Sequence, residues 1–135
     1  MDGYRSLAAW QAAQELCLKT LEATDGPMHR RAWTVVDQLR RAAVSADVNI
    51  VEGYALGTAP LFRRHARIAL GSAAEAQRLL VISAARAYLP EATTTLLQGL
   101  ADQAVRRLYG LVRTQNLPFA QPPRKPRPPP PTPHR

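Results

Sequence analysis

Four apolar patterns with helical spacing, separated by proline and glycine residues, limit the folds open to this chain more than any other feature. The third pattern is the clearest, because its apolar residues recur every three or four positions and so share one side of a helix. These residues are Phe62, Ala66, Ala69, Ala73, Ala76 and Leu80. Residues that favour strands are scattered and do not alternate. The sequence therefore predicts an all-α protein.

Breaker residues set the expected ends of the first two helices. The first helix is predicted from Tyr4 to Ala23, where the segment "TDGP" (24–27) follows. Its expected core residues are Leu7, Trp10, Gln14, Cys17 and Leu21. The second helix is predicted from Pro27, in its first turn, to Glu52 or Leu56. Gly53 and Gly57 are candidate C-cap residues for this helix.

The remaining helices have similar boundary residues. Thr58 is predicted to cap the third helix, with Pro60 in its first turn, and Pro90 to open the fourth. Because the connections are short, neighbouring helices should be antiparallel, which predicts an up-down-up-down four-helix bundle over residues 1–117. Alanine dominates the inner sides of the second and third helices, so these two should approach closely.

Residues 118–135 form a separate segment of different composition, with nine of the twelve prolines and no acidic residue. Proline cannot donate to a helix or sheet, so this segment should be a disordered, extended tail. Its basic residues are Arg124, Lys125, Arg127 and Arg135. We interpret it as a flexible basic arm that adds attraction to nucleic acid. A docking segment for an aromatic groove, or an extension without function, are the alternatives.

The net charge is +8, and sixteen of the eighteen basic residues are arginine, which favours an anionic partner. A GC-rich genome would also raise the arginine content, but it would not explain the excess positive charge. In the third helix, Glu75 is the only acidic residue from Thr58 to Pro90. The arginines grouped on one side of this helix are Arg63, Arg64, Arg67 and Arg78. We predict that they bind the phosphates of nucleic acid, although a merely solvated surface would look similar.

Further arginines are expected to assist this binding; they are Arg30, Arg31, Arg40 and Arg41 in the second helix, together with those of the tail. The second helix also has a second apolar side, formed by Trp33, Val44 and Val51. Exposed aromatic and apolar surface is typical of subunit contacts, so we predict a homo-oligomer. The alternative is that the first helix or the loops cover these side chains.

A polar stripe, formed by Arg41, Ser45, Asn49 and Glu52, runs along the remaining side of the second helix. If this stripe faces Ser72 and Glu75 of the third helix, the six residues should form a hydrogen-bonded structural cluster. If the stripe faces solvent, it indicates no particular structural role.

Catalytic and metal-binding functions find little support. His29, His65 and His134 lack the spacing of paired metal ligands, and no Gly-rich phosphate loop is present. Cys17 is the only cysteine, so neither an intrachain disulfide nor a thiolate metal cluster is possible. No uncharged apolar run approaches the roughly 18 residues of a membrane span, and the first residues lack a signal-peptide pattern. We expect a cytoplasmic protein that is not an enzyme and uses no cofactor or metal.

Two central motifs carry a resemblance to a known family. "QLRRAAVSADVNIVEG" (38–53) followed by "FRRHARIALGSAAEAQ" (62–77) resembles the bacterial four-helix-bundle proteins first noticed as reading frames in intervening sequences of large-subunit ribosomal RNA genes. "LAAWQAAQEL" (7–16) resembles the opening helix of that family. The matching motif positions are Arg41, Ser45, Asn49, Glu52, Gly53, Gly71, Ser72 and Glu75. Two departures stand out: Ala46-Asp47 replaces a frequent Ile-Pro, and Gln77 replaces a usual glutamate.

The resemblance implies a homo-oligomer, a pentameric ring with a basic surface. It also implies a relation to the accessory variability determinant proteins of diversity-generating retroelements, which bind nucleic acid and a reverse transcriptase. The sequence therefore predicts a non-enzymatic, oligomeric accessory protein that binds RNA or DNA and assists a reverse transcriptase. The alternative is a structural homo-oligomeric scaffold that acts through protein–protein contacts.

Overall fold

The computed structural model describes residues 3–119 and 126–133. A short 3-10 helix, η1 (Gly3–Ser6), precedes four long helices. These are α1 (Ala8–Thr24), α2 (Arg30–Ala55), α3 (Ala59–Ala85) and α4 (Glu91–Arg113). The described residues include no strand, so the predicted all-α class is confirmed.

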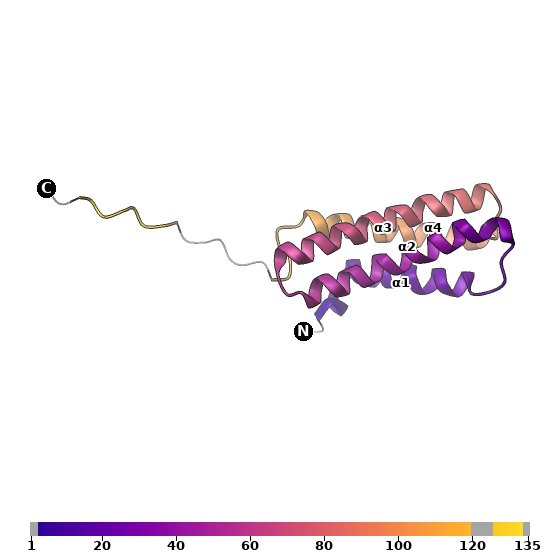
Figure 1. Cartoon of the computed structure of the whole chain (residues 1–135), viewed down its shortest axis with the longest axis horizontal. Helices are drawn as coiled ribbons and strands as arrows, with labels where there is room; N and C mark the ends of the chain where they lie inside the picture. Colours follow the sequence, from indigo (N-terminus) through magenta and orange to yellow (C-terminus); the bar gives the residue numbers. More distant parts are fainter. Residues whose placement is uncertain (1–2, 120–125, 134–135) are drawn as a thin grey trace.

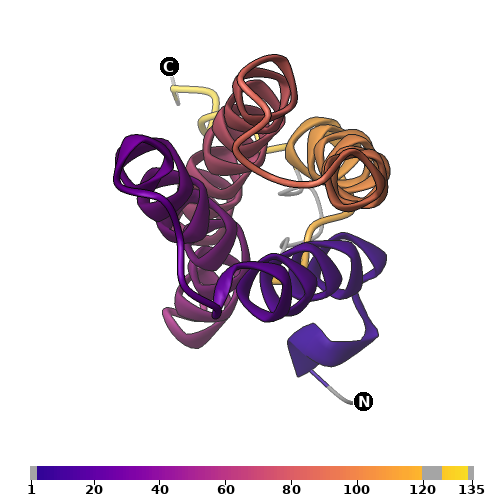
Figure 2. The ribbon, with the colours of Figure 1, turned by 90° about the vertical axis from the view of Figure 1, so that its right-hand side faces the viewer.

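The four helices form an antiparallel bundle with up-down-up-down connections, as the short links predicted (Figure 1). Each helix packs against its neighbour in the chain, and α1 packs against α4, which closes the bundle. Seen along its length, the bundle has one helix at each corner (Figure 2). The contact between α2 and α3 is the most extensive of the four.

Helix ends follow the predicted cap residues at some positions and depart from them at others. Thr58 caps α3 by accepting a hydrogen bond from the Leu61 amide at 3.4 Å, and a proline lies in the first turn. α2 begins later than predicted, with His29 and not Pro27 next to its first turn; the His29 side chain accepts from the Arg31 amide. α2 also continues past Gly53 and ends before Gly57, which has a φ of +74°. Of the two candidate C-cap glycines, only Gly57 therefore ends a helix.

The core of the bundle is rich in alanine. All six predicted core residues of α3 are fully buried, and Phe62 is the largest of them. Of the five core residues predicted for α1, only Cys17 is buried, and Leu7, Trp10, Gln14 and Leu21 are half-buried. The residues of α1 that are buried are Ala9, Ala12, Ala13, Leu16, Cys17, Thr20 and Thr24. Small residues contrast little with polar ones in hydropathy, so the pattern pointed to the larger side chains beside the true core side.

Gly53 explains how closely α2 and α3 approach. A Cβ atom added at this buried glycine would lie 2.7 Å from His65 Cβ and 3.3 Å from Phe62 Cα. Real Cβ atoms essentially never come as close as 2.7 Å to another atom, so glycine is required at this crossing. The predicted close approach of the two helices is therefore present at Gly53.

An aromatic cluster closes the end of the bundle from which the C-terminal segment leaves. The Phe119 ring packs edge-on against Tyr54 at 4.9 Å and Phe62 at 6.4 Å between centroids, and Leu117 is buried beside them. Of the predicted basic tail residues, Arg127 is exposed, while Arg124, Lys125 and Arg135 lie outside the described residues. Residues 126–133 form neither helix nor strand.

By length and composition, α3 is the one helix in the described part of the chain that could cross a membrane, with a mean hydropathy of 1.2. The bundle accounts for much of this apolar character. Its inner side, from Phe62 to Leu80, lies in the core between α2 and α4.

Candidate nucleic-acid interface

The arginines of α3 divide into one structural residue and three exposed ones. Arg63 is half-buried and donates from Nη1 to the Val112 carbonyl and from Nη2 to the Thr114 carbonyl, the latter at 3.1 Å. These carbonyls belong to the C-terminal end of α4, where a cation is favoured by the helix dipole. Arg64, Arg67 and Arg78 are exposed and form no ion pair with a described residue. Arg63 therefore holds two helices together, and the other three guanidinium groups face solvent.

The first two turns of α3 border an open groove of about 740 Å³. Its lining is Ala59, Pro60, Arg63, Arg64, Arg67 and Ile68, with no acidic residue. The positive end of the α3 dipole adds to these three arginines, so the potential of this groove favours an anion.

α4 contributes further exposed arginines that the sequence reasoning missed: Arg106, Arg107 and Arg113. Two contacts fix the antiparallel register of α3 and α4. Arg63 meets Val112 and Thr114 at one level, and Gln77 donates to Asp102 at 2.7 Å further along. One turn beyond Arg63, Arg67 therefore lies within about one turn of Tyr109 along α4. These three arginines lie within eight residues of one another in α4. The local excess of arginine that marked the third helix in the sequence therefore marks this helix as well.

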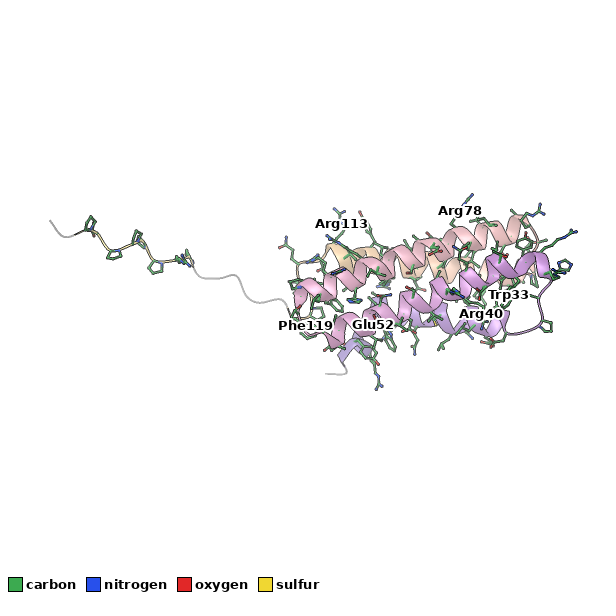
Figure 3. All side chains as sticks on the ribbon, viewed as in Figure 1. Trp33, Arg40, Glu52, Arg78, Arg113 and Phe119 are labelled. Carbon is green, nitrogen blue, oxygen red and sulfur yellow. The ribbon has the colours of Figure 1, made fainter. Side chains whose placement is uncertain are left out.

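We call the outer side of α3 and α4 the basic face, and define it by Arg64, Arg67, Arg78, Arg106 and Arg113. Figure 3 shows Arg78 and Arg113 pointing away from the bundle on the same side. Arg106 lies at the edge of the basic face next to α1, because it lines with Arg107 a groove of about 640 Å³ between α1 and α4. The basic face extends along two neighbouring helices and therefore carries more unpaired positive charge than the third helix alone.

The predicted assisting arginines of α2 do not join the basic face. Arg30 and Arg31 are exposed in the first turn of α2, at the opposite end of the bundle from Arg64 and Arg67. Arg40 stabilises the C-terminal end of α1, because it donates hydrogen bonds to Thr24 Oγ1 at 2.7 Å and to Asp25 Oδ1 at 3.0 Å. Arg41 pairs with Asp37 one turn away, at 3.1 Å.

The polar stripe of α2 meets α3 over part of its length. The hydroxyl oxygens of Ser45 and Ser72 are 2.7 Å apart, and Asn49 Nδ2 donates to Ser45 Oγ at 3.0 Å. His65 completes the cluster, with its Nδ1 3.0 Å from Asn49 Oδ1 and 3.7 Å from Glu52 Oε2.

Arg41 and Glu75 lie apart from this cluster. Arg41 bonds to Asp37, and Glu75 accepts from Gln38 at 2.9 Å. His65 was missed, although its seven-residue separation from Ser72 places both on one side of α3. Because its polar atoms bond to one another across the two helices, the cluster serves as a structural lock. Within residues 3–119 and 126–133, no group of three or more His, Cys, Asp or Glu side chains could hold a metal ion.

Exposed apolar side chains lie on α1 and α2, as they also do on α3 and α4, where Leu61, Ile68, Val81 and Leu96 are exposed. Trp33 is 51% exposed, so neither α1 nor the loops cover it; it lies near one end of the bundle (Figure 3). Val44 and Val51 are half-buried. Leu18 and Val48, which the sequence reasoning did not select, are 55% and 41% exposed.

Comparison with known proteins identifies the family. Residues 5–110 match the family model described as 23S rRNA-intervening sequence protein. The chain belongs to this family. A crystal structure of a protein of unknown function from the S23 ribosomal protein family of Bacteroides thetaiotaomicron has the same fold, with a TM-score of 0.65 at 15% identity. The similarity covers 78% of this chain and 99% of the other. A search of curated proteins found no match.

In this member of the 23S rRNA-intervening sequence protein family, Asp47, one of the residues that depart from the family motif, contributes to helix packing. Asp47 Oδ1 accepts a hydrogen bond from Trp10 Nε1 at 2.9 Å, which ties α1 to α2, and α2 is continuous through this position. Burial and the nearby Asp47 carboxylate raise the pKa of the Cys17 thiol to about 11. Asp47 therefore has a structural role at the contact of α1 and α2.

Proposed function

We propose that this protein binds nucleic acid through the basic face of α3 and α4. The observation that carries the proposal is that the five arginines of this face are exposed and form no ion pair with a described residue. Asp102 lies with Arg78 in the groove between α3 and α4, but the five arginines still leave an excess of positive charge on these two helices, which favours a polyanionic partner. Membership of a family described by its link to 23S rRNA supports an RNA-related role.

The physical basis is counterion release. Each phosphate that an arginine neutralises frees condensed cations, so the affinity should fall steeply as salt increases, with a log–log slope near −0.7 per contact for a single strand. Arginine also offers two parallel donors to one phosphate, which a lysine does not. The basic face therefore predicts binding that depends on the number of phosphates contacted.

The test is the double substitution Arg64→Glu/Arg67→Glu, with fluorescence anisotropy of a labelled RNA measured over a range of KCl concentrations. Loss of two contacts should make the slope shallower by about 1.4. The matched control is Arg30→Glu/Arg31→Glu, which changes the net charge equally at the other end of the bundle. An equal loss of affinity in both variants would mean that only the overall charge matters, and would refute the basic face as the binding site.

A second function, self-association, is favoured by the apolar surface of α1 and α2. Trp33, Val48 and Leu18 are each at least 41% exposed, and burying them in a subunit contact would remove that apolar surface from water. Size-exclusion chromatography with light scattering measures the assembly. A monomer of 14.9 kDa at all concentrations would refute self-association. An oligomer without salt-dependent RNA binding would favour the scaffold function over the nucleic-acid function.

Other expectations from the sequence stay predictions. These are the pentameric stoichiometry, the reverse-transcriptase partner, the cytoplasmic location and the absence of catalytic activity. A reverse transcriptase recovered with this protein would connect the nucleic-acid and scaffold functions.

A further inference from the structure

Tyr109 is an unusual residue on the basic face. It is 52% exposed, although a large aromatic ring normally gains stability by burial. Arg106 precedes it by three residues and Arg113 follows it by four, so all three share one side of α4. The register of α3 and α4 places Arg67 within about one turn of this ring along the bundle. An exposed ring among arginines is not part of the bundle core and calls for a ligand with both aromatic and anionic character.

The Tyr109 side chain is held in place by Arg113. Arg113 Nη1 donates to Tyr109 Oη at 2.8 Å, and its guanidinium carbon lies 5.1 Å from the ring centroid. This contact occupies the hydroxyl and fixes the direction of the ring, while half of the side chain stays accessible to solvent. The ring is therefore positioned before a ligand arrives, which lowers the entropy cost of binding.

We infer that the basic face binds unpaired, single-stranded nucleic acid, with one base stacked on Tyr109 and the neighbouring phosphates held by Arg67, Arg106 and Arg113. This inference rests on the proposed function and names its substrate class. In a duplex the faces of the bases are already stacked on one another, so an exposed ring contacts them only where the strand is unpaired. Arg106 and Arg113 lie about 10 Å apart along the helix, on either side of Tyr109.

The other exposed aromatic residues lack this setting. Trp33 lies on the second apolar side of α2, and the acidic Asp37 follows it by four residues, so a protein contact suits it better. Phe119 packs against Tyr54 and Phe62 at the end of the bundle. Among the residues that the structure describes, only Tyr109 combines an exposed ring with arginines from two helices that form no ion pair.

The experiment compares Tyr109→Ala and Tyr109→Phe in the full chain. The probes are a labelled single-stranded oligoadenylate and a fully paired RNA duplex with the same number of phosphates, and anisotropy gives both dissociation constants. Tyr109→Ala should weaken single-strand binding by roughly 5- to 150-fold and change duplex binding by less than about twofold. Tyr109→Phe keeps the ring and should stay within about threefold of the unmodified protein. Circular dichroism checks that both variants remain folded.

Three results would overturn the inference. The first is unchanged single-strand binding by Tyr109→Ala while Arg64→Glu/Arg67→Glu weakens both probes; the proposed function then stands without a stacking role. The second is an equal loss for both probes in Tyr109→Ala. The third is competition by oligoglutamate as strong as that by oligoadenylate, which would assign the face to acidic peptides. Absence of salt-dependent binding to either probe would refute the proposed function itself.

Discussion

The close approach of α2 and α3 at Gly53 leads to a quantitative prediction. In Gly53→Ala the new Cβ would lie 2.7 Å from His65 Cβ and 3.3 Å from Phe62 Cα. Both of these atoms are held by the α3 backbone, so neither can move aside by a simple rotation. The helices must separate locally, which would disturb the contact between His65 and Asn49 and the packing of Phe62.

Two terms of opposite sign decide the result. Alanine is favoured over glycine within a helix by about 1 kcal/mol. Overpacking of a tight core costs about 1–3 kcal/mol, and the upper part of this range applies because the obstructing atoms belong to the backbone or are fixed to it. Gly53→Ala should therefore lower the free energy of unfolding by about 1–2 kcal/mol.

Gly71→Ala is the matched control. Gly71 also lies inside a long helix, but it is exposed, and an added Cβ would meet nothing within 4 Å. Only the helix-propensity term then remains, so this variant should be more stable by about 0.5–1 kcal/mol. The two substitutions are chemically identical, and their effects should differ by about 2–3 kcal/mol, or roughly 10 °C in melting temperature.

The assay is urea unfolding followed by circular dichroism, at several protein concentrations because self-association would make the apparent stability concentration-dependent. If Gly53→Ala is as stable as the unmodified protein while Gly71→Ala is stabilised as expected, the proposed close contact of α2 and α3 is wrong.

Three other predictions follow from single side chains. Thr20 is fully buried and its hydroxyl has no hydrogen-bond partner in the described residues, so Thr20→Val should raise the free energy of unfolding by about 1 kcal/mol in the same urea assay. Arg63→Ala should lower it by about 2 kcal/mol and increase hydrogen exchange in the last turn of α4, because two carbonyls lose a charged donor; an unchanged exchange rate would contradict that role. The raised pKa of Cys17, about 11, means that the unfolded chain loses the thiol proton first as the pH rises. Stability should therefore fall between about pH 9 and pH 11, and Cys17→Ala, measured in parallel, should lack that part of the decrease.

Much of the fold was predictable because local chemistry determines helix ends and apolar sides. Thr58, Pro60 and Gly57 act at the backbone positions where each residue type is favoured, independently of the rest of the chain. All six predicted core residues of α3 are buried, since Phe62 and Leu80 contrast clearly with the arginines on its outer side, whereas buried Leu79 and Ser83 were not predicted. The family motifs led to the same fold by a separate route.

The candidate site was predictable only in part, because a helical pattern assigns a residue to a side of its own helix and not to a partner. Arg63 and Arg67 share one side of α3 in sequence, yet one binds the end of α4 and the other faces solvent. The register between α2 and α3 brings His65 into the polar cluster and leaves Arg41 outside it.

The sequence by itself determined the four helices, their approximate ends, the excess of arginine and the apolar second side of α2. Three further features depend on the tertiary structure: which alanine-rich side of α1 is buried, why Gly53 lacks a side chain, and which arginine of α3 comes near Tyr109. The physical reason is that the first set depends on interactions within a few residues along the chain. The second set depends on distances between helices, and these are determined only when the side chains of all four helices pack together.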